Sequence, residues 1–326
     1  MPNITAPAPG TLAVRTVLGD LPPAELGVCD AHDHLFLRSP LLPGQELDDA
    51  DAAAAELRSF AALGGRSVVQ WTPFALGRRA GLLAGLSRAT GVRVVAATGL
   101  HQAAHYTPEL LRSLDSPAEL FVRELTVGMA PDDTPEGNPL PARAGLIKVA
   151  GGFHGLDAHA RRVLRAAAEA HHATGAPVAV HLEAGTGAPA VLELLCGRLD
   201  MPPARVLLGH LNRSPDPWVH REAARAGAHL VFDGPSRAHH ATDWRLFEML
   251  TALVEAGHAD RLLLGGDTVT ANARAATGEG PGMPYLLSGL RPAVERRLGR
   301  EVAELLFVGN PARAFAAHWR GDGHRA

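Results

Sequence analysis

Short apolar runs alternate with longer segments of helical period along nearly the whole chain. Eight runs have the length and composition of strands, and apolar residues three or four apart mark the helical segments between them. The runs are Gly27–Leu37, Arg66–Thr72, Val92–His101, Leu146–Gly151, Pro177–Ala184, Val206–Asn212, His229–Gly234 and Arg261–Thr268. The clearest helical segments are Asp48–Leu63, Ala158–Thr174, Pro189–Arg198, Trp218–Ala226 and Asp243–Gly257. This alternation predicts βα units built on a parallel sheet.

Eight such units within about 240 residues predict an α/β fold of the (β/α)8 TIM barrel class. The alternative is a doubly wound open sheet. No glycine-rich phosphate-binding turn follows the first strand, where the chain reads Leu35-Phe36-Leu37-Arg38. We expect a single domain over residues 1–326, with the barrel over 27–326. Residues 1–26 form a short N-terminal extension, with a small hairpin around Val17–Asp20.

Composition excludes several classes of protein. With 326 residues, 46% of them hydrophobic, the chain can bury a large core. A net charge of -3 without a basic cluster argues against nucleic acid as a partner. Met1–Thr11 has neither the basic residues nor the apolar core of a signal peptide, and no apolar run reaches the ~18 residues of a membrane helix. Two cysteines provide no disulfide framework, so we expect a cytoplasmic protein without a membrane partner.

Of the 31 basic residues, only Lys148 is a lysine. Arginine can replace lysine as a charge, but its guanidinium stays protonated and cannot act as a nucleophilic amine. A buried lysine amine can lose its proton and react with CO2 to form a carbamate, which binds metals as a carboxylate does. The alternative is a lysine that extends its ammonium to water from the end of a strand.

Polar residues interrupt the apolar runs where the predicted strands end. His32 and His34 lie two apart in the first strand, so both side chains face the same side. The other polar residues at strand ends are Lys148, His181, His210 and Asp267. Each alone could be a core histidine, a turn residue or a helix cap. A barrel brings all these strand ends to the face where active sites lie. Together they could bind two divalent ions that share a hydroxide.

The order His-x-His, Lys, His, His, Asp on strands one, four, five, six and eight resembles the phosphotriesterase family of the amidohydrolase superfamily. The likeness runs from Thr16–Asp20 to Gly309–Arg313 and includes Gly91–Leu100. It implies that the six strand-end residues are metal ligands, divided between two ions. His32 and His34 would bind the more buried ion, and His181 and His210 the more exposed one.

The same resemblance implies a bridging carbamate on Lys148, and a catalytic Asp267 that binds the first ion and transfers the proton. We expect zinc from the imidazole-rich ligand set, with manganese or cobalt as alternatives. The expected function is that of a binuclear hydrolase using a metal-bridging hydroxide on a lactone or related carboxyl ester, with promiscuous phosphotriesterase activity. The alternatives are a phosphotriester or sugar-phosphate lactone hydrolase, and a non-catalytic ligand-binding protein on the same scaffold. We also expect a small-molecule substrate and a homodimer.

Substrate contacts are predicted from the loops. His101 follows Thr98-Gly99-Leu100 and is a candidate hydrogen-bond donor. The other candidates for substrate binding are Arg237, Arg274 and Trp71. For each of these residues the alternative is a solvated loop position or a packing role. Thr270 and Ala271 stand where the sugar-phosphate branch of the family carries an arginine pair, which argues against a phosphorylated substrate.

Overall fold

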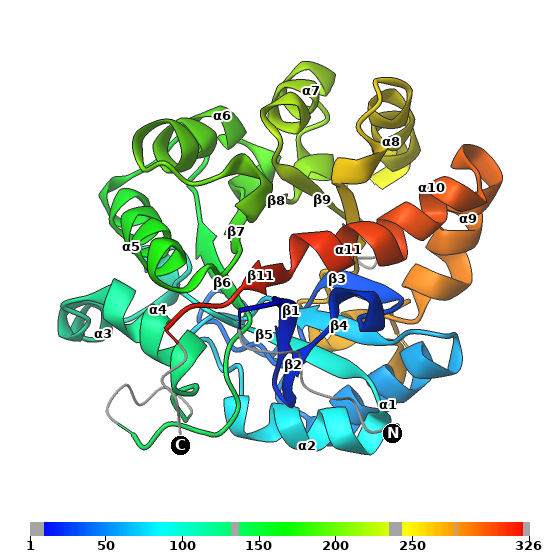
Figure 1. Cartoon of the computed structure of the whole chain (residues 1–326). Coiled ribbons are helices and arrows are strands. Elements are labelled where there is room, and N and C mark those ends of the chain that lie inside the picture. The colour runs from blue at the N-terminus through cyan, green and yellow to red at the C-terminus, as the bar shows by residue number, and fades with distance from the viewer. Residues whose placement is uncertain (1–9, 132–136, 235–242, 278, 322–326) are drawn as a thin grey trace.

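The computed structural model describes residues 10–131, 137–234, 243–277 and 279–321. Its central element is an eight-stranded parallel sheet in which the neighbours along the chain are also neighbours in space. The strands are β3 (Cys29–Asp33), β4 (Ser67–Gln70), β5 (Arg93–Thr98), β6 (Leu146–Ala150), β7 (Val178–His181), β8 (Val206–Gly209), β9 (His229–Asp233) and β10 (Leu262–Gly265). Each lies within one of the eight predicted runs. The predicted (β/α)8 barrel is confirmed (Figure 1).

The sheet closes between its first and last strands, β3 and β10. The Asp267 backbone N–H donates to the His32 carbonyl at 2.9 Å, just beyond the end of β10. A Cβ atom on Gly265 would lie 2.6 Å from the His32 backbone N and O. Only glycine fits there, and the close approach of the two backbones fixes His32 and Asp267 relative to each other.

Helices surround the barrel (Figure 1). They are α1 (Ala50–Ala62), α2 (Ala80–Thr90), α3 (Pro108–Ser113), α4 (Pro117–Thr126), α5 (Ala158–Thr174), α6 (Ala188–Leu192), α7 (Pro217–Ala226), α8 (Leu246–Glu255), α9 (Arg291–Leu298), α10 (Arg300–Glu304) and α11 (Asn310–Ala314). The carboxylates of Asp49, Asp157 and Asp216 accept backbone N–H groups at the starts of α1, α5 and α7. These caps explain why the predicted starts of these three helices agree with the structure to within two residues.

Small and branched apolar side chains fill the barrel interior below the strand ends. On three strands an interior apolar residue is followed two positions later by a polar one, which therefore points the same way, one layer higher. The apolar residues are Leu146, Ala179 and Val231, and the polar residues above them are Lys148, His181 and Asp233. Strand alternation thus delivers these three polar side chains to the upper layer of the barrel interior.

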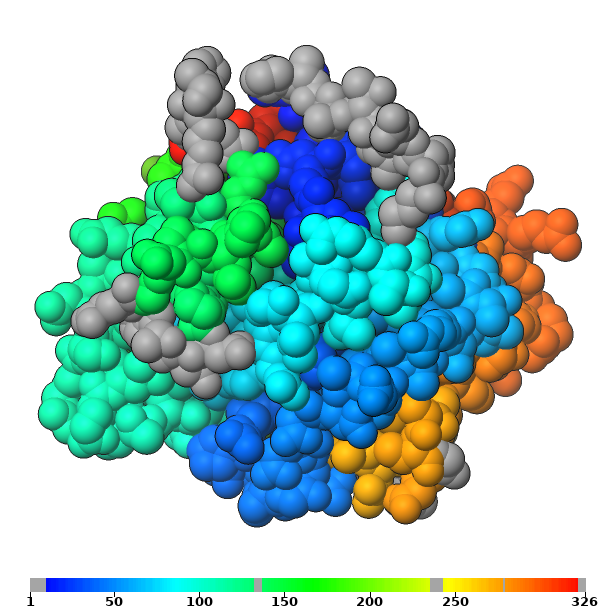
Figure 2. All heavy atoms as spheres, turned by 90° about the horizontal axis from the view of Figure 1, so that it is seen from below, coloured from blue at the N-terminus to red at the C-terminus, as the bar shows by residue number. Residues whose placement is uncertain are grey.

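A second, three-stranded sheet is made of β1 (Leu12–Thr16), β2 (Gly19–Leu21) and β11 (Ala316–His318). The β1–β2 hairpin is the one predicted for the N-terminal extension. Strand β11, from the far end of the chain, pairs with β1 and was not predicted. The buried Arg15 guanidinium lies over the Trp319 ring and pairs with Asp20. Figure 2 shows the hairpin in dark blue at one end of the molecule, with α2 in cyan on the face turned to the viewer.

Within the described residues, no helix has both the length and the apolar composition needed to span a membrane.

Candidate metal centre

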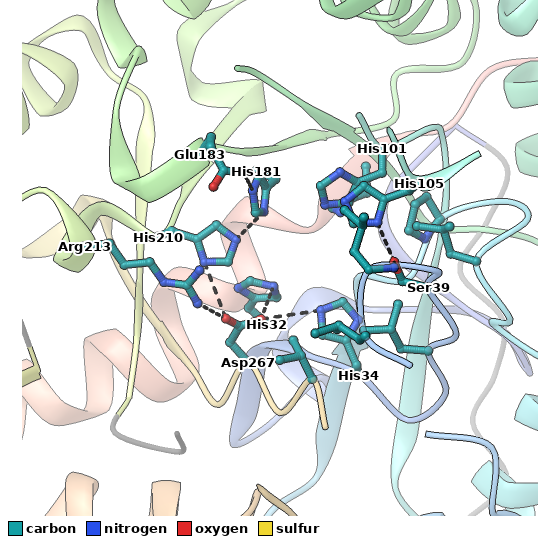
Figure 3. A pocket seen from close by; sticks show the side chains of 17 residues that line it. His32, His34, Ser39, His101, His105, His181, Glu183, His210, Arg213 and Asp267 are labelled. Atoms are coloured by element: carbon teal, nitrogen blue, oxygen red, sulfur yellow. Dashed lines mark hydrogen bonds and ion pairs between the residues drawn. The ribbon is translucent and has the colours of Figure 1, made fainter. Parts of the chain in front are cut away.

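The loops that follow the strands enclose a pocket of about 760 Å³, including its open mouth (Figure 3). All six predicted metal ligands line it. The remaining lining residues are Leu37, Ser39, Leu41, Leu42, Pro73, Leu76, His101, His105, Glu183, Arg213 and Val269. The lining therefore combines imidazole and carboxylate groups with apolar side chains.

His32, His34 and Asp267 converge on one point of the pocket. The Nε2 atoms of His32 and His34 lie 3.4 and 3.5 Å from Asp267 Oδ1. That oxygen is buried and has no hydrogen-bond partner in the described part of the chain. An unpaired buried carboxylate oxygen is costly unless a cation or a donor satisfies it. The three atoms fit the ligand set of a divalent ion.

The hydrogen bonds on the far side of each ring fix the tautomers of these two histidines. His32 Nδ1 lies 2.9 Å from Asp233 Oδ1, a carboxylate oxygen that can only accept. His34 Nδ1 lies 2.7 Å from Thr72 Oγ1, whose own hydrogen is donated to the Phe36 carbonyl at 2.5 Å. Both Nδ1 atoms therefore carry the hydrogen, and both Nε2 lone pairs face Asp267. Burial lowers the pKa of His34 to about 4, which keeps this ring neutral.

His181 and His210 each direct one ring-nitrogen lone pair toward the other ring. His181 Nε2 lies 3.1 Å from Glu183 Oε2, and His210 Nδ1 lies against Asp233 Oδ2 at 2.5 Å. Carboxylates accept at both positions, which leaves His181 Nδ1 and His210 Nε2 facing each other at 2.7 Å. Two lone pairs at that separation repel unless a cation lies between them or beside them. These two nitrogens are the donors expected for the second predicted metal position.

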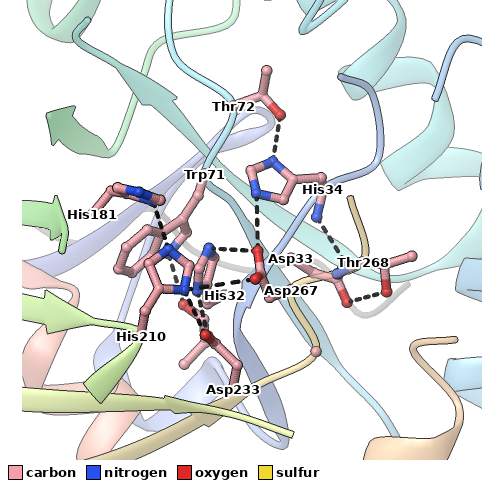
Figure 4. Close-up of polar contacts among 12 residues, drawn as sticks. His32, Asp33, His34, Trp71, Thr72, His181, His210, Asp233, Asp267 and Thr268 are labelled. Atoms are coloured by element: carbon pink, nitrogen blue, oxygen red, sulfur yellow. Dashed lines mark hydrogen bonds and ion pairs between the residues drawn. The ribbon is translucent and has the colours of Figure 1, made fainter. Parts of the chain in front are cut away.

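Asp233 was not among the predicted site residues. Its two oxygens accept from His32 and His210, one ligand of each predicted metal position (Figure 4). A carboxylate behind a metal-binding histidine fixes its tautomer and raises its basicity. The sequence could have revealed it, because Asp233 follows the interior residue Val231 by two in β9, and residues two apart in a strand face the same side.

Lys148 is 2% exposed, and its ammonium makes no hydrogen bond or ion pair with the residues described. Burial lowers its pKa from 10.5 to about 7, with Asp267 opposing the shift. A large share of this amine is therefore neutral at physiological pH. The structure places a reactive amine in the wall of the same pocket as the histidines.

His210 and Asp267 both adopt left-handed backbone conformations, with φ of 66° and 51°. Each follows a glycine directly after a strand. Such conformations cost roughly 1–2 kcal/mol for a residue with a Cβ, and they cluster at functional sites. Here they turn both side chains into the pocket where the strands end.

Two buried carboxylates, Asp30 and Asp33, lie between β3 and β10. Asp30 Oδ1 accepts the backbone N–H of His32 and of Gly266, and Asp33 Oδ1 accepts that of His34 and of Thr268. Burial raises the pKa of both, for Asp30 to about 6. They connect the segments that carry the first ligand set.

The predicted substrate residues have different outcomes. His101 lines the pocket, with its ring centroid 4.5 Å from that of His181. Trp71 does not line it, because its ring stacks 3.8 Å behind His32 and its Nε1–H donates to the Ala31 carbonyl. Arg274 does not line it either, because its guanidinium is buried against the Leu35 carbonyl. Arg237 lies outside the described residues.

Sequence reasoning missed two charged residues of the pocket, Glu183 and Arg213. Glu183 follows His181 by two and accepts from Gln102 Nε2 at 2.9 Å as well as from His181. Arg213 follows His210 by three, and its Nη2 donates to Asp267 Oδ2. In a chain with 31 basic residues, nearly all arginine, the identity of Arg213 carried no signal.

A TIM barrel whose strand ends hold two sets of inward-facing imidazole lone pairs and a buried carboxylate defines a metal-dependent hydrolase. The chain belongs to the phosphotriesterase family, whose model matches residues 12–315. It is 29% identical over 324 residues to a phospho-furanose lactonase of Mycoplasmopsis synoviae, covering 93% of this chain and 91% of that one.

Solved structures agree with this assignment. A lactonase from Listeria monocytogenes superposes with a TM-score of 0.83 at 28% identity, covering 93% of this chain and 98% of that one. The phosphotriesterase homology protein of Escherichia coli, with phosphate in its active site, superposes with a TM-score of 0.80 at 26% identity, covering 89% and 99%.

Proposed function

We propose that this protein is a binuclear metal hydrolase that opens lactones or related carboxyl esters. The observation that carries the proposal is the pairing of two donor sets in one pocket. One is His32, His34 and Asp267 around an unpaired carboxylate oxygen, and the other is His181 and His210 with facing lone pairs. Two divalent cations would satisfy both sets at neutral pH.

The residues present fit two divalent ions, with zinc favoured by the imidazole donors. His32, His34 and Asp267 would hold one ion, and His181 and His210 the other. Two bound cations would lower the pKa of a shared water toward neutrality and polarise the carbonyl of the substrate. Asp233 orients one ligand of each set through its two oxygens.

Lys148 is proposed to supply the ligand shared by the two ions. Its neutral amine attacks CO2, forming an N–C bond and releasing one proton, and the resulting carbamate has two oxygens. Burial, the lowered pKa and the absence of any other partner among the described residues support this role. An unmodified ammonium would add a positive charge beside the ions that the histidines would hold.

The chain's own groups then carry the proton and hold the substrate. Asp267 accepts the proton that the attacking water loses, and returns it to the oxygen that leaves the acyl carbon. His101 is a candidate donor to a substrate oxygen, because its Nδ1 accepts the Gln102 N–H and its Nε2 therefore carries the hydrogen. The apolar wall formed by Leu37, Leu41 and Leu42 suits a hydrocarbon portion of the ester.

A lactone is favoured over a phosphorylated substrate. Relatives named lactonases support the ester chemistry. Thr270 and Ala271 replace the expected arginine pair, and Arg274 is buried against Leu35 rather than in the pocket. Phosphotriester cleavage is proposed as a side activity, because the same nucleophile attacks a P=O centre. Association into a homodimer stays a prediction, for which light scattering is the measurement.

The proposed function is tested by metal analysis combined with a panel of lactones, aryl esters and an aryl phosphotriester. We expect up to two divalent ions per chain, loss of hydrolysis after chelation and its return on adding Zn, Mn or Co. Full hydrolysis by a metal-free sample would overturn the mechanism. A metal-loaded protein that hydrolyses nothing in the panel but binds a lactone would instead indicate a binding protein on this scaffold.

A further inference from the structure

Arg213 lies in the pocket wall beside Asp267. It ends a single 3-10 turn, Leu211–Arg213, that follows β8 and His210. Asn212 fixes this turn to the next strand by accepting the Asp233 backbone N–H at 3.0 Å. The turn also packs closely on the loop after β7, since a Cβ on Gly185 would lie 2.7 Å from Ser214 N. The position of Arg213 is therefore set by the fold.

The guanidinium contacts the described residues through one nitrogen. Nη2 donates to Asp267 Oδ2 and lies 3.6 Å from Asp233 Oδ2. Nε is sealed from solvent and has no hydrogen-bond partner among the described residues. Nη1 makes no hydrogen bond to any residue the structure describes, and it is not among the sealed atoms. A charged donor is thus left in the pocket next to the carboxylate proposed to transfer the proton (Figure 3).

We propose that Arg213 is a further catalytic residue that stabilises the leaving oxygen of the ester. The inference rests on the proposed function. The oxygen of a water molecule bonds to the acyl carbon, and its proton goes to Asp267. The bond from the acyl carbon to the leaving oxygen then breaks, its electron pair stays on that oxygen, and Asp267 returns the proton. The products are a carboxylic acid and an alcohol.

Arginine suits this role because it stabilises developing negative charge without giving up its own proton. Because Arg213 lies beside Asp267, its positive charge and the proton that Asp267 returns would reach the leaving oxygen from the same side. Two other roles are the alternatives. Arg213 could serve only as the counter-charge of the Asp267 and Asp233 carboxylates, or it could bind a fixed anionic group of the substrate. The dependence of the rates on the leaving group and on the acyl chain distinguishes the three roles.

The test compares Arg213→Met and Arg213→Lys with the wild type on hexanoate esters of para-nitrophenol, phenol and ethanol. These share one acyl group and differ in how much charge the leaving oxygen carries. We expect Arg213→Met to lower kcat/KM by about a hundredfold for the phenyl and ethyl esters, the loss typical of one donor to a developing oxyanion. The loss for the para-nitrophenyl ester, whose leaving group is the most stable anion, should be below about tenfold. Arg213→Lys should recover part of the difference.

The matched control is Arg225→Met, which removes an exposed arginine from helix α7, directly after the same loop. It should change none of the three rates. Equal losses on all three esters, with or without lowered metal content, would assign Arg213 the counter-charge role and overturn the proposal. A loss that depends on adding a carboxylate to the acyl chain, and not on the leaving group, would overturn it in favour of anion binding. A wild type that hydrolyses none of the esters or lactones contradicts the proposed function itself.

Discussion

At the scale of single residues, Lys148 separates this site from an ordinary histidine cluster. Its amine is buried, has no partner among the described residues, and has a pKa near 7. A structural lysine would be expected to reach solvent or a carboxylate. The combination of a reactive amine with unsatisfied metal-type donors in the same pocket is what the carbamate explains.

We predict that Lys148→Ala lowers the metal content to about one ion per chain or less. Activity should fall by roughly a hundredfold or more, since a lost ligand exceeds the 10–100-fold effect typical of a lost outer partner. Lys148→Glu, with a shorter native carboxylate, should recover part of both. Lys148→Arg should fail, because a guanidinium cannot ligate a cation. Metal analysis and ester hydrolysis measure these outcomes.

The modification itself has a direct readout. A metal-loaded sample supplied with 13C-bicarbonate should show one carbamate signal by NMR, absent in the Lys148→Arg protein. The single lysine of this chain makes the assignment unambiguous among side chains. A fully metallated, active wild type without that signal would contradict the role given to Lys148.

At the scale of elements, the segment after β10 is held over the barrel by a carboxylate from helix α1. Glu56 is 1% exposed and accepts the backbone N–H groups of Ala275, Ala276 and Met283. The same segment continues from Asp267 and Val269, two residues of the pocket wall. One buried side chain therefore satisfies three donors of a loop that borders the site.

We predict that Glu56→Ala lowers the free energy of unfolding by about 3 kcal/mol or more, because three buried N–H groups lose their acceptor at roughly 1–3 kcal/mol each. Glu56→Gln, which keeps one acceptor oxygen, should lose less. Denaturant unfolding measures both. Glu222→Ala, which removes an exposed glutamate of α7, is the control and should change stability by less than about 0.5 kcal/mol. Equal stability of Glu56→Ala and the control would show that the loop is held by other contacts.

The elements also show what the sequence could predict. All eight barrel strands were found, because a buried parallel strand is a continuous apolar run. The predicted runs extend past β3, β7 and β10, because the chain leaves the sheet at His34, Leu182 and Gly266 while its residues stay apolar or small. Strand β11 was missed because its three residues, Ala316–His318, pair with β1 from the other end of the chain, a contact that no local pattern encodes.

The sequence predicted that residues line one pocket where their spacing carried information, and missed those whose place depends only on tertiary contacts. His32, His34, Lys148, His181 and His210 stand at equivalent places in their βα units. The sequence could not distinguish Arg213 from the other arginines, because its role depends on its contact with Asp267. Asp233, Trp71 and Arg274 were missed or misplaced for the same reason, since each acts through a neighbour from a distant strand or loop.

At the scale of the whole molecule, folding stability is linked to pH through buried neutral histidines. Burial lowers the pKa of His34 and His229 to about 4 and that of His210 to about 3. His34 and His210 belong to the candidate metal centre. His229 starts β9, at the end of that strand away from Asp233, and its Nδ1 is buried with no hydrogen-bond partner among the described residues. Burial thus keeps the imidazoles uncharged both in the pocket and at the other end of the barrel.

The sign of the linkage follows from these directions. The unfolded chain protonates each histidine below pH ~6.5, whereas the folded metal-free protein does not until about pH 4. Between those limits the unfolded state holds more protons, so the free energy of unfolding falls as the pH falls. Each such histidine contributes up to about 1.4 kcal/mol per pH unit between those limits. The raised pKa values of the buried Asp30 and Asp33 act in the opposite direction, because there the folded state holds more protons.

We therefore predict that His229→Gln, in metal-free protein, changes the slope of stability against pH between about pH 6 and 4.5 by about 1.4 kcal/mol per pH unit, without changing metal content. Urea unfolding at several pH values measures the slope. His258→Gln, at a partly exposed turn position, is the control and should leave it unchanged. A slope that His229→Gln does not alter would show that His229 takes up its proton in the folded state, by opening locally at the base of the barrel. A loss of stability with falling pH that is steeper in His229→Gln than in the wild type would contradict the buried neutral state of this ring.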